Sequence, residues 1–282
     1  MKAVIPAAGL GTRILPATKA IPKELLCLID RPMIQYVVEE AVGAGIRDVV
    51  IVTSPGKEAL EQHFAPAPEL ERVLESKGKT DLLDAVRATS DLANVTFAVQ
   101  EEALGLGHAV FCAREEVGDE PFAVLLPDEL FGGPDLLRSL VKQHKRFTAP
   151  VIAVMEMPDD EISNYGVVDP EEIEADLVRM KDFVEKPPAD EAPSNLGSIG
   201  RYVLTAEVMD ALGRTEPGTG GEIQLTDAIA TVARSSVGYA LVHRGERHDA
   251  GRPLGYLKAT VALALQHPAL AADFRAFLSK KN

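Results

Sequence analysis

The sequence predicts an α/β fold with a Rossmann-like, mostly parallel (mixed) sheet flanked by helices. Short apolar runs predict buried strands at residues 2–6, 48–53, 95–99, 122–126 and 151–155. Amphipathic patterns between these strands predict helices at residues 33–44, 57–64, 109–116 and 136–144. Because strands that alternate with helices form βαβ units, we expect helices on both faces of the sheet.

The second half continues with strand-like runs at residues 178–185, 200–205 and 239–243, followed by helical patterns at 256–265 and 269–278. The chain shows no internal repeat, low-complexity linker or clear boundary. Its 282 residues lie within the range of one α/β domain. We therefore expect a single domain over residues 1–282, with an elaborated C-terminal half.

The formal net charge of −14 and the isoelectric point near 4.9 argue against a general binder of nucleic acid or anionic membranes. The sequence contains neither a secretory signal pattern nor an apolar run long enough to cross a bilayer. Its two cysteines, Cys27 and Cys112, have apolar neighbours and no CxxC spacing, which predicts reduced thiols in the core. Together these features predict a cytoplasmic protein.

The first 23 residues differ from the rest of this acidic chain, because they contain four cations and no acid. The first predicted strand leads directly into the glycine-containing segment Ala7-Ala8-Gly9-Leu10-Gly11-Thr12-Arg13. Glycines after a first strand let the backbone approach a nucleotide and direct its N–H groups at phosphate. A strand-end turn uses the same residues, so the glycines alone do not decide between a ligand site and a turn.

Two familiar phosphate sites fit this segment poorly. In a dinucleotide site, Asp30 lies about as far beyond the glycines as the acid that binds the ribose. However, Ile14 takes the place of the third glycine. Pro16 and Pro22 interrupt the helix whose N-terminus would hold pyrophosphate. A P-loop is excluded because no Gly-Lys-Ser/Thr follows the glycines. The remaining interpretation is an extended loop whose cations, Arg13, Lys19 and Lys23, wrap a triphosphate.

Two aspartates follow strand-like runs, where the ligand crevice of an open α/β sheet lies. Asp128 ends the 122–126 strand, and Asp249 follows the strand at 239–243. Carboxylates there are well placed to hold Mg²⁺ against substrate phosphates. A solvated turn explains Asp128 less well, whereas a loop aspartate beside glycine explains Asp249 at least as well.

Three further groups have a structural interpretation beside a functional one. Gln100 offers a donor and an acceptor to a base, yet it also fits a surface glutamine after a strand. Glu185 and Lys186 can also be explained as a solvent-exposed ion pair at the end of an edge strand, which the following proline terminates. Glu222, three residues after Thr219, has the spacing of a capping box. His108 has no acid or nucleophile nearby and is interpreted as structural or phosphate-adjacent.

The segments Ala8-Gly9-Leu10-Gly11-Thr12-Arg13 and Leu15-Pro16-Ala17-Thr18-Lys19-Ala20-Ile21-Pro22-Lys23-Glu24 resemble the signature of bacterial UTP–glucose-1-phosphate uridylyltransferases. The resemblance continues to Tyr256 and implies a glycosyltransferase-A-like nucleotidyltransferase fold. Residues 1–150 would then bind the nucleotide and residues 151–282 the sugar phosphate. The resemblance implies catalytic roles for Arg13 and Lys23, and Mg²⁺ binding by Asp128 and Asp249. It implies nucleotide binding by Ala7, Ala8, Gly9, Gly11, Thr12, Glu24, Gln100, Gly105 and Gly107, and sugar-phosphate binding by Gly166, Glu185, Lys186 and Glu222.

The implied reaction joins UTP and glucose 1-phosphate into UDP-glucose and pyrophosphate. Alternatives are another sugar nucleotidyltransferase such as a glucose-1-phosphate thymidylyltransferase, a non-catalytic nucleotide-sugar sensor, or a dehydrogenase. The chain departs from the branch pattern at Cys27, His248, Ala250 and Arg252-Pro253, which are neighbours of the expected contacts. A homo-oligomer, dimer or tetramer, is expected. The C-terminal helices have an apolar face that would pack either against a partner subunit or in the core of the same chain.

Overall fold

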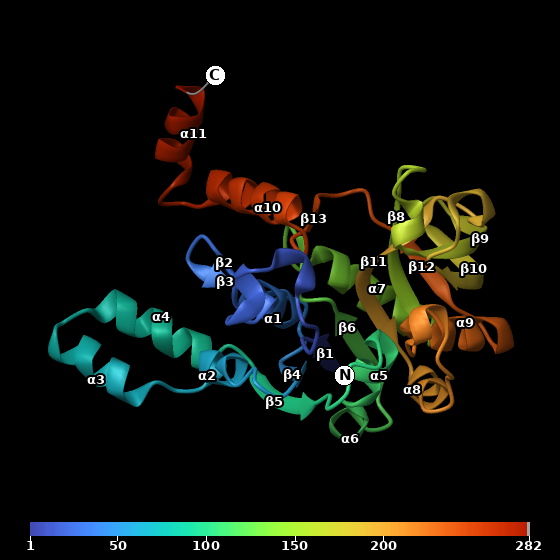
Figure 1. Cartoon of the computed structure of the whole chain (residues 1–282), viewed down its shortest axis with the longest axis horizontal. Coiled ribbons are helices and arrows are strands. Elements are labelled where there is room, and N and C mark those ends of the chain that lie inside the picture. The colour runs from blue at the N-terminus through green and yellow to red at the C-terminus, as the bar shows by residue number, and fades with distance from the viewer. Residues whose placement is uncertain (281–282) are drawn as a thin grey trace.

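The computed structural model describes residues 1–280, except for the side chain of Glu172. Its centre is a nine-stranded mixed sheet with the order β5-β4-β1-β6-β11-β8-β12-β10-β9, which crosses the molecule in Figure 1. The β5-β4-β1-β6 part and the β8-β12 pair are parallel, whereas β11 is antiparallel to both its neighbours, and β10 is antiparallel to β12 and β9. The strands are β1 Lys2–Pro6, β4 Asp48–Thr53, β5 Asn94–Val99, β6 Phe122–Leu125, β8 Val151–Glu156, β9 Gly166–Glu174, β10 Leu177–Glu185, β11 Leu196–Leu204 and β12 Tyr239–Val242.

Two short ribbons lie outside this sheet: β2 Cys27–Leu28 with β3 Arg31–Pro32, and β7 Glu129–Phe131 with β13 Arg247–Asp249. The helices are α1 Met33–Gly43, α2 Ala59–Phe64, α3 Pro68–Ser76, α4 Thr80–Ser90, α5 Leu106–Phe111, α6 Arg114–Val117, α7 Asp135–Phe147, α8 Ala206–Leu212, α9 Leu225–Ser235, α10 Pro253–Gln266 and α11 Ala271–Ser279. No helix within residues 1–280 is long and apolar enough to span a membrane.

The central strands are apolar throughout because both of their faces are covered. Successive residues of β1 enter opposite cores: Val4 packs with α5, α8 and α9, whereas Ala3 and Ile5 pack with α1 and α7. The same alternation in β4 and β6 gives each face of the sheet its own hydrophobic core. The predicted covering of both faces is therefore confirmed.

The predicted elements from residue 2 to residue 64 match β1, α1, β4 and α2 closely. The helix predicted at 109–116 is wrong in detail, because α5 begins earlier, after Gly105, and Cys112-Ala113 separates it from α6. Cys27 is exposed and not in the core, because the side chains of β2 alternate and Leu28 takes the buried position. Cys112 is half-buried, and both thiols are free.

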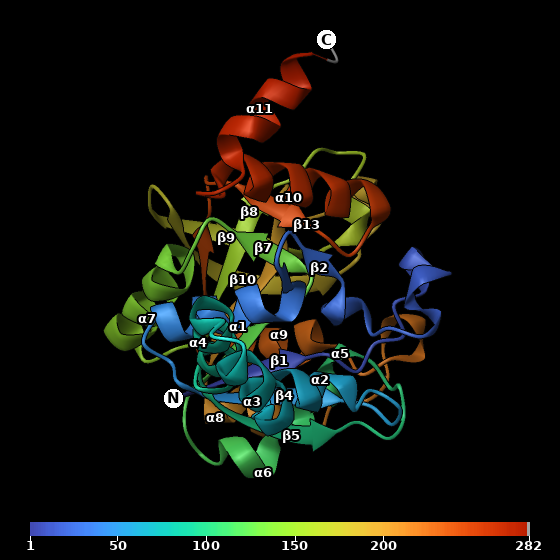
Figure 2. The ribbon, with the colours of Figure 1, turned by 90° about the vertical axis from the view of Figure 1, so that its left-hand side faces the viewer.

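Two parts of the chain project from the body of the molecule. The α3–α4 hairpin extends beyond the β5 side of the sheet in Figure 1. At the other end of the chain, α10 lies over the β7–β13 ribbon, and α11 points away from the body in Figures 1 and 2. The candidate site lies at the carboxyl ends of β1 and β6, and the first turn of α10 adjoins it at Asp249.

Candidate active site

Two adjoining cavities open at the carboxyl ends of β1 and β6, with volumes of about 420 and 230 Å³. Both are lined by Leu106, Leu126, Asp128 and Glu222, so they meet at these residues. The larger cavity is also lined by Ala8, Gly9, Thr12, Lys23, Gln100 and Gly105, and the smaller by Arg13, Gly166, Glu185, Lys186 and Asp249. Most of the predicted site residues therefore line one connected space, and Asp128 lies at its centre.

The glycine loop after β1 forms three short 3₁₀ turns, Thr12–Ile14, Ala17–Lys19 and Lys23–Leu25, and no α-helix. Within residues 1–280, the backbone N–H groups of Ala8, Gly9, Leu10 and Gly11 have no protein acceptor. Ala8, Gly9 and Leu10 line the larger cavity, and free backbone amides can bind an anion without a helix dipole. The two prolines thus led to a correct prediction that no α-helix follows the glycines, while phosphate binding by this loop stays a prediction.

Four predicted nucleotide-binding residues line neither cavity. Ala7 is fully buried, and its N–H donates to Val52 O at 2.7 Å. The carbonyl of Gly11 accepts from Thr18 at 2.8 Å, and the N–H of Gly107 donates to Ile223 O at 2.8 Å. The carboxylate of Glu24 is 1% exposed and lies beneath the loop. Their predicted nucleotide contact remains a prediction, and the structure gives each of them a supporting position.

Lys23 and Asp128 form an ion pair between the loop and the end of β6, with Nζ 2.5 Å from Oδ2. Burial would raise the pKa of Asp128, but the charge and hydrogen bond of Lys23 hold this pKa below its usual value. Burial likewise opposes the charged form of Lys23, whereas Asp128 and Glu24 raise its pKa above the usual value. Both groups are therefore ionised at neutral pH.

Arg13 and Lys19 are the two cations of the loop whose side chains have no partner among residues 1–280, and of these only Arg13 lines one of the two cavities. The Arg13 side chain is exposed, lines the smaller cavity and makes no ion pair or hydrogen bond with any of residues 1–280. Its charge still acts on the Lys23–Asp128 pair, because it helps to lower the pKa of Asp128 and opposes the raised pKa of Lys23. A cation without a partner at a polar cavity is suited to bind a phosphate.

The β7–β13 ribbon brings Asp249 to Asp128. Asp249 pairs with Glu129 in this ribbon, and the N–H of Ala250 donates to Asp128 O at 2.8 Å. A Cβ atom at Gly251 would lie 2.6 Å from Asp128 Oδ2 and 3.1 Å from Asp249 Oδ1, so only glycine fits between the two carboxylates. Residues 1–280 contain no group of three or more acids, histidines or cysteines that could hold a metal. Two neighbouring carboxylates are oxygen ligands of the kind that suit Mg²⁺ together with phosphate and water.

Gln100 lines the larger cavity with a fixed amide. Its Nε2 donates to the carbonyl of Gly105 at 3.2 Å and lies 3.0 Å from Nδ1 of His108. Because a carbonyl only accepts, the Gly105 contact fixes which side of the amide carries nitrogen. Both N–H groups of Gln100 are thereby engaged, and within the described residues Oε1 has no donor. His108 contacts Gln100 through Nδ1, which is consistent with the structural part of its predicted role.

Glu222 is not a helix cap. The cap of α9 is Gln224, and Thr219–Gly221 is a separate 3₁₀ turn, so the capping-box interpretation is wrong. The segment instead closes over α5: Ile223 N–H donates to Leu104 O at 2.8 Å, and a Cβ at Gly105 (φ +107°) would lie 2.7 Å from Glu222 Cβ. This close approach places the Glu222 side chain where the two cavities meet.

Glu185 and Lys186 form the far wall of the smaller cavity, at the end of β10. Glu185 accepts from Thr226 Oγ1 at 2.6 Å and lies 3.0 Å from Lys186 Nζ. Lys186 has a φ of +44°, which is unfavourable for a residue with a side chain. Strain of this kind persists where the surrounding structure enforces it, often at functional sites. The Lys186 side chain is half exposed, and its ammonium group pairs with Glu185 at the wall of the cavity.

Two buried arginines that the sequence did not reveal support Asp128 and Asp249. Arg201 is fully buried, pairs with Glu40 at 2.8 Å and donates to the carbonyls of Leu126 and Glu129, on either side of Asp128. Arg247 binds both carboxylate oxygens of Glu129, at 2.7 and 2.5 Å. Burial, together with the negative charges of Asp128 and Asp249, raises the pKa of Glu129 to about 7 against the opposing effect of Arg247. The turn at Asp128 is thus held from both sides.

Comparison with known proteins identifies the family of the chain. The model of the family "Nucleotidyl transferase" matches residues 2–266. The chain is 48% identical over 278 residues to a UTP–glucose-1-phosphate uridylyltransferase of Bacillus subtilis, covering 98% of this chain and 95% of that protein.

Two solved structures are also similar to the chain. A UTP-bound UGPase from Acinetobacter baumannii is similar with a TM-score of 0.92 and 42% identity, over 100% of this chain and 99% of that one. A UDP-glucose pyrophosphorylase complexed with UDP-glucose is similar with a TM-score of 0.85 and 38% identity, over 94% and 99%. The chain belongs to the nucleotidyl transferase family, in the branch of the bacterial UTP–glucose-1-phosphate uridylyltransferases, and is an enzyme of that class.

Proposed function

We propose that the protein transfers the uridylyl group of UTP to α-D-glucose 1-phosphate, giving UDP-glucose and pyrophosphate. The observation that carries this proposal is the pair of cavities that meet at Asp128. One has the free amides of the glycine loop and the fixed amide of Gln100, and the other has Lys186 and Glu185. A reaction between a nucleotide and a sugar phosphate needs two such sites with the phosphates facing each other.

The chemistry needs no covalent enzyme intermediate. An oxygen of the sugar phosphate forms a bond to the α-phosphorus of UTP, the bond from that phosphorus to the bridging oxygen of pyrophosphate breaks, and pyrophosphate leaves. The attacking oxygen is already ionised at neutral pH, so positioning and charge neutralisation carry the catalysis. Arg13 and Lys23 would neutralise the negative charge that develops on pyrophosphate. Lys186 would position the sugar phosphate.

Nucleotidyltransferases generally use a divalent metal ion, and we propose Mg²⁺ here. Asp128 and Asp249 would hold it, and it would supply neutralisation of the triphosphate charge. The ion pair with Lys23 uses only Oδ2 of Asp128, so Oδ1 would remain available to such an ion. The Lys23 ammonium would then lie beside both the ion and the phosphates.

The proposal also covers the roles of the two halves of the chain, the cell compartment and the oligomeric state. We propose that residues 1–150 contribute most of the nucleotide side of the site and residues 151–282 most of the sugar-phosphate side, with Glu222 and Arg13 reaching across to the other half's cavity. We propose that the enzyme works in the cytoplasm, where nucleoside triphosphates are available and where Cys27 and Cys112 stay reduced. We also propose that it forms a homo-oligomer, dimer or tetramer, through the α10–α11 surface.

The test is pyrophosphate release from the purified protein across a grid of UTP, dTTP, CTP and ATP against glucose 1-phosphate and other sugar 1-phosphates. We expect the highest kcat/KM for UTP with glucose 1-phosphate. A preference for dTTP would instead identify a thymidylyltransferase. Tight binding of UTP without pyrophosphate release would identify a nucleotide-sugar sensor, and either result would overturn the proposal.

A further inference from the structure

Lys57 lies outside every motif of the sequence, yet its ammonium group reaches under the glycine loop. It follows β4, and its Nζ donates to Ala7 O at 2.5 Å and to Gly9 O at 2.7 Å. The third contact is an ion pair with Glu24 Oε2 at 3.1 Å. A lysine ammonium has three N–H donors, so all of them are used inside the protein.

These contacts fix the direction of the loop backbone. The carbonyls of Ala7 and Gly9 point inward to Lys57, while the N–H groups from Ala8 to Gly11 are left without protein acceptors. In a dinucleotide-binding fold the following α-helix holds such a loop, but only 3₁₀ turns follow here. Lys57 therefore holds the backbone of the glycine loop in place, as the α-helix does in a dinucleotide-binding fold.

Glu24 and Lys57 depend on each other for their charge. The side chain of Lys57 is 10% exposed and that of Glu24 is 1% exposed. Burial raises the pKa of Glu24 and lowers the pKa of Lys57, and the attraction between the two groups opposes both effects. Removing one partner leaves the other as an unpaired buried charge, which is strongly unfavourable. Glu24 thus keeps the Lys57 ammonium in place beneath the loop.

We propose that Lys57 is a positioning residue for nucleotide binding, which holds the glycine loop with its amides directed at the triphosphate. The inference rests on the proposed function, because it assigns the loop to UTP. It predicts an effect confined to the nucleotide, since Lys57 lines neither cavity and has no contact with the Glu185–Lys186 wall.

The test is the variant Lys57→Met, which keeps the length of the side chain and removes its charge and its donors. We expect the KM for UTP to rise at least about tenfold, because small displacements of a binding loop have effects of this size. The KM for glucose 1-phosphate should stay within about twofold. Lys142→Met, an exposed lysine on α7, is the matched control and should leave both values unchanged.

Lys57→Met has two effects: it removes the contacts that position the loop, and it leaves the buried Glu24 carboxylate unpaired. The double variant Lys57→Met/Glu24→Gln removes that unpaired charge as well, so it shows the loss of positioning alone in a folded protein. We expect it to regain the wild-type Tm while the KM for UTP stays high. Glu24→Gln alone should raise that KM less, because Lys57 keeps both carbonyl contacts. A wild-type KM for UTP in the double variant, or an equal rise in both KM values, would overturn the proposal. If the wild type shows no turnover, calorimetric Kd values for UTP still test Lys57 separately from the proposed function.

Discussion

Lys23 and Asp128 illustrate how single residues serve two roles in the site. Their ion pair of 2.5 Å joins the loop to the end of β6, and in the proposed reaction Lys23 neutralises pyrophosphate while Asp128 would hold the metal ion. Arg13 has no such partner in residues 1–280. We expect Arg13→Ala and Lys23→Ala each to lower kcat by roughly two or more decades, as for lost electrostatic stabilisation of a transition state.

Steady-state pyrophosphate release measures both effects, with Lys145→Ala on α7 as a charge-matched control that should retain wild-type kcat. Lys23→Ala also leaves Asp128 without its cation, so its KM for the nucleotide should change together with kcat. Arg13→Ala leaves that ion pair intact. Near-wild-type turnover in both variants would contradict the assigned roles.

At this scale, the sequence could reveal residues that follow strands but not residues that support them. Asp128 and Gln100 come directly after apolar runs, so their places at the crevice could be predicted. Arg201 pairs with Glu40, 161 positions away in the chain, and no local pattern signals that contact. Lys57 did offer one signal, because it follows β4 at the same edge of the sheet.

Helix α5 fixes the amide that faces the larger cavity. His108 and Gly105 occupy both N–H groups of Gln100, which leaves Oε1 as an acceptor. Such an acceptor suits the N3–H of uracil and repels N3 of cytosine, which is itself an acceptor. We expect His108→Phe to free the amide and lower the preference for UTP over CTP at least about tenfold, measured as the ratio of kcat/KM values.

His63→Phe is the control for this prediction, because His63 also contacts a glutamine, Gln35, at 3.1 Å but lies on α2 outside both cavities. It should keep the wild-type ratio. If His108→Phe also keeps that ratio while UTP remains the preferred nucleotide, the base is selected by other groups.

The elements that the sequence missed are those whose side chains do not follow the usual burial patterns. Edge strand β9 carries Asp169, Glu171 and Glu174, so its composition is that of a loop. Leu70 and Val73 on α3 and Leu82 on α4 are exposed, so the α3–α4 hairpin buries little of its apolar surface. In contrast, β1, β4 and β6 are covered on both faces, and their apolar runs made them predictable.

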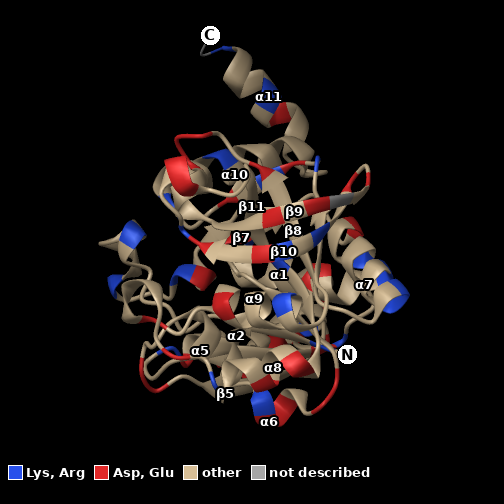
Figure 3. Ribbon diagram, turned by 90° about the vertical axis from the view of Figure 1, so that its right-hand side faces the viewer, with Lys and Arg blue, Asp and Glu red and all other residues tan. Residues whose placement is uncertain are grey.

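On the scale of the whole molecule, the sheet joins the two halves of the chain, because β11 lies between β6 and β8. The cavities meet at this junction, where the loop after β6 and the β13 ribbon from the end of the chain supply the two aspartates. Basic residues lie among acidic ones on the face shown in Figure 3. The chain as a whole has a net charge of −14, so the local excess of cations in the glycine loop is an exception to its surroundings. Such a local excess favours the approach of a small polyanion.

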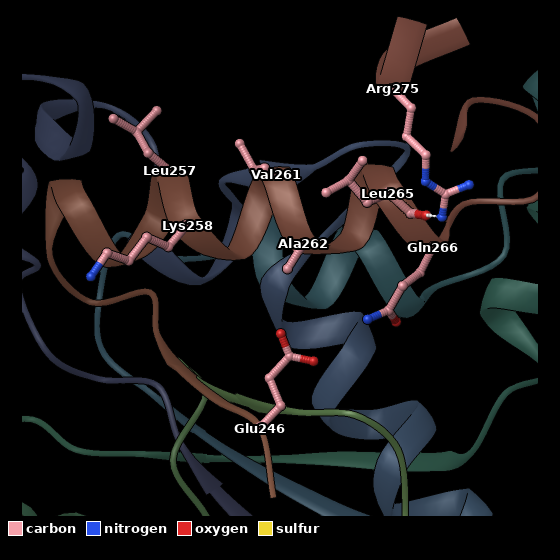
Figure 4. Close-up of a pocket in the computed structure, with 8 residues that line it drawn as sticks. All are labelled: Glu246, Leu257, Lys258, Val261, Ala262, Leu265, Gln266 and Arg275. Atoms are coloured by element: carbon pink, nitrogen blue, oxygen red, sulfur yellow. Dashed lines mark hydrogen bonds between the residues drawn. The ribbon is translucent and has the colours of Figure 1, made fainter. Parts of the chain in front are cut away.

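The surface formed by α10 and α11 is the part of the molecule that we expect a second copy of the chain to cover. Leu254 and Leu257 of α10 are 64% and 59% exposed. Figure 4 shows Leu257, Val261 and Leu265 along this helix, beside a groove of about 530 Å³. Arg275 of α11 reaches back to the carbonyl of Leu265 at 2.8 Å, while α11 itself projects from the body.

An apolar row on a projecting helix pair is typical of a subunit interface. We expect light scattering after gel filtration to give the wild type a mass that is a multiple of 30.2 kDa. The variant Leu257→Glu/Val261→Glu should shift it toward a single chain, because two carboxylates would have to lose their water at the interface. Leu82→Glu, an equally exposed leucine on α4, should leave the mass unchanged. A wild-type mass of one chain at micromolar concentration would show that this surface does not join subunits.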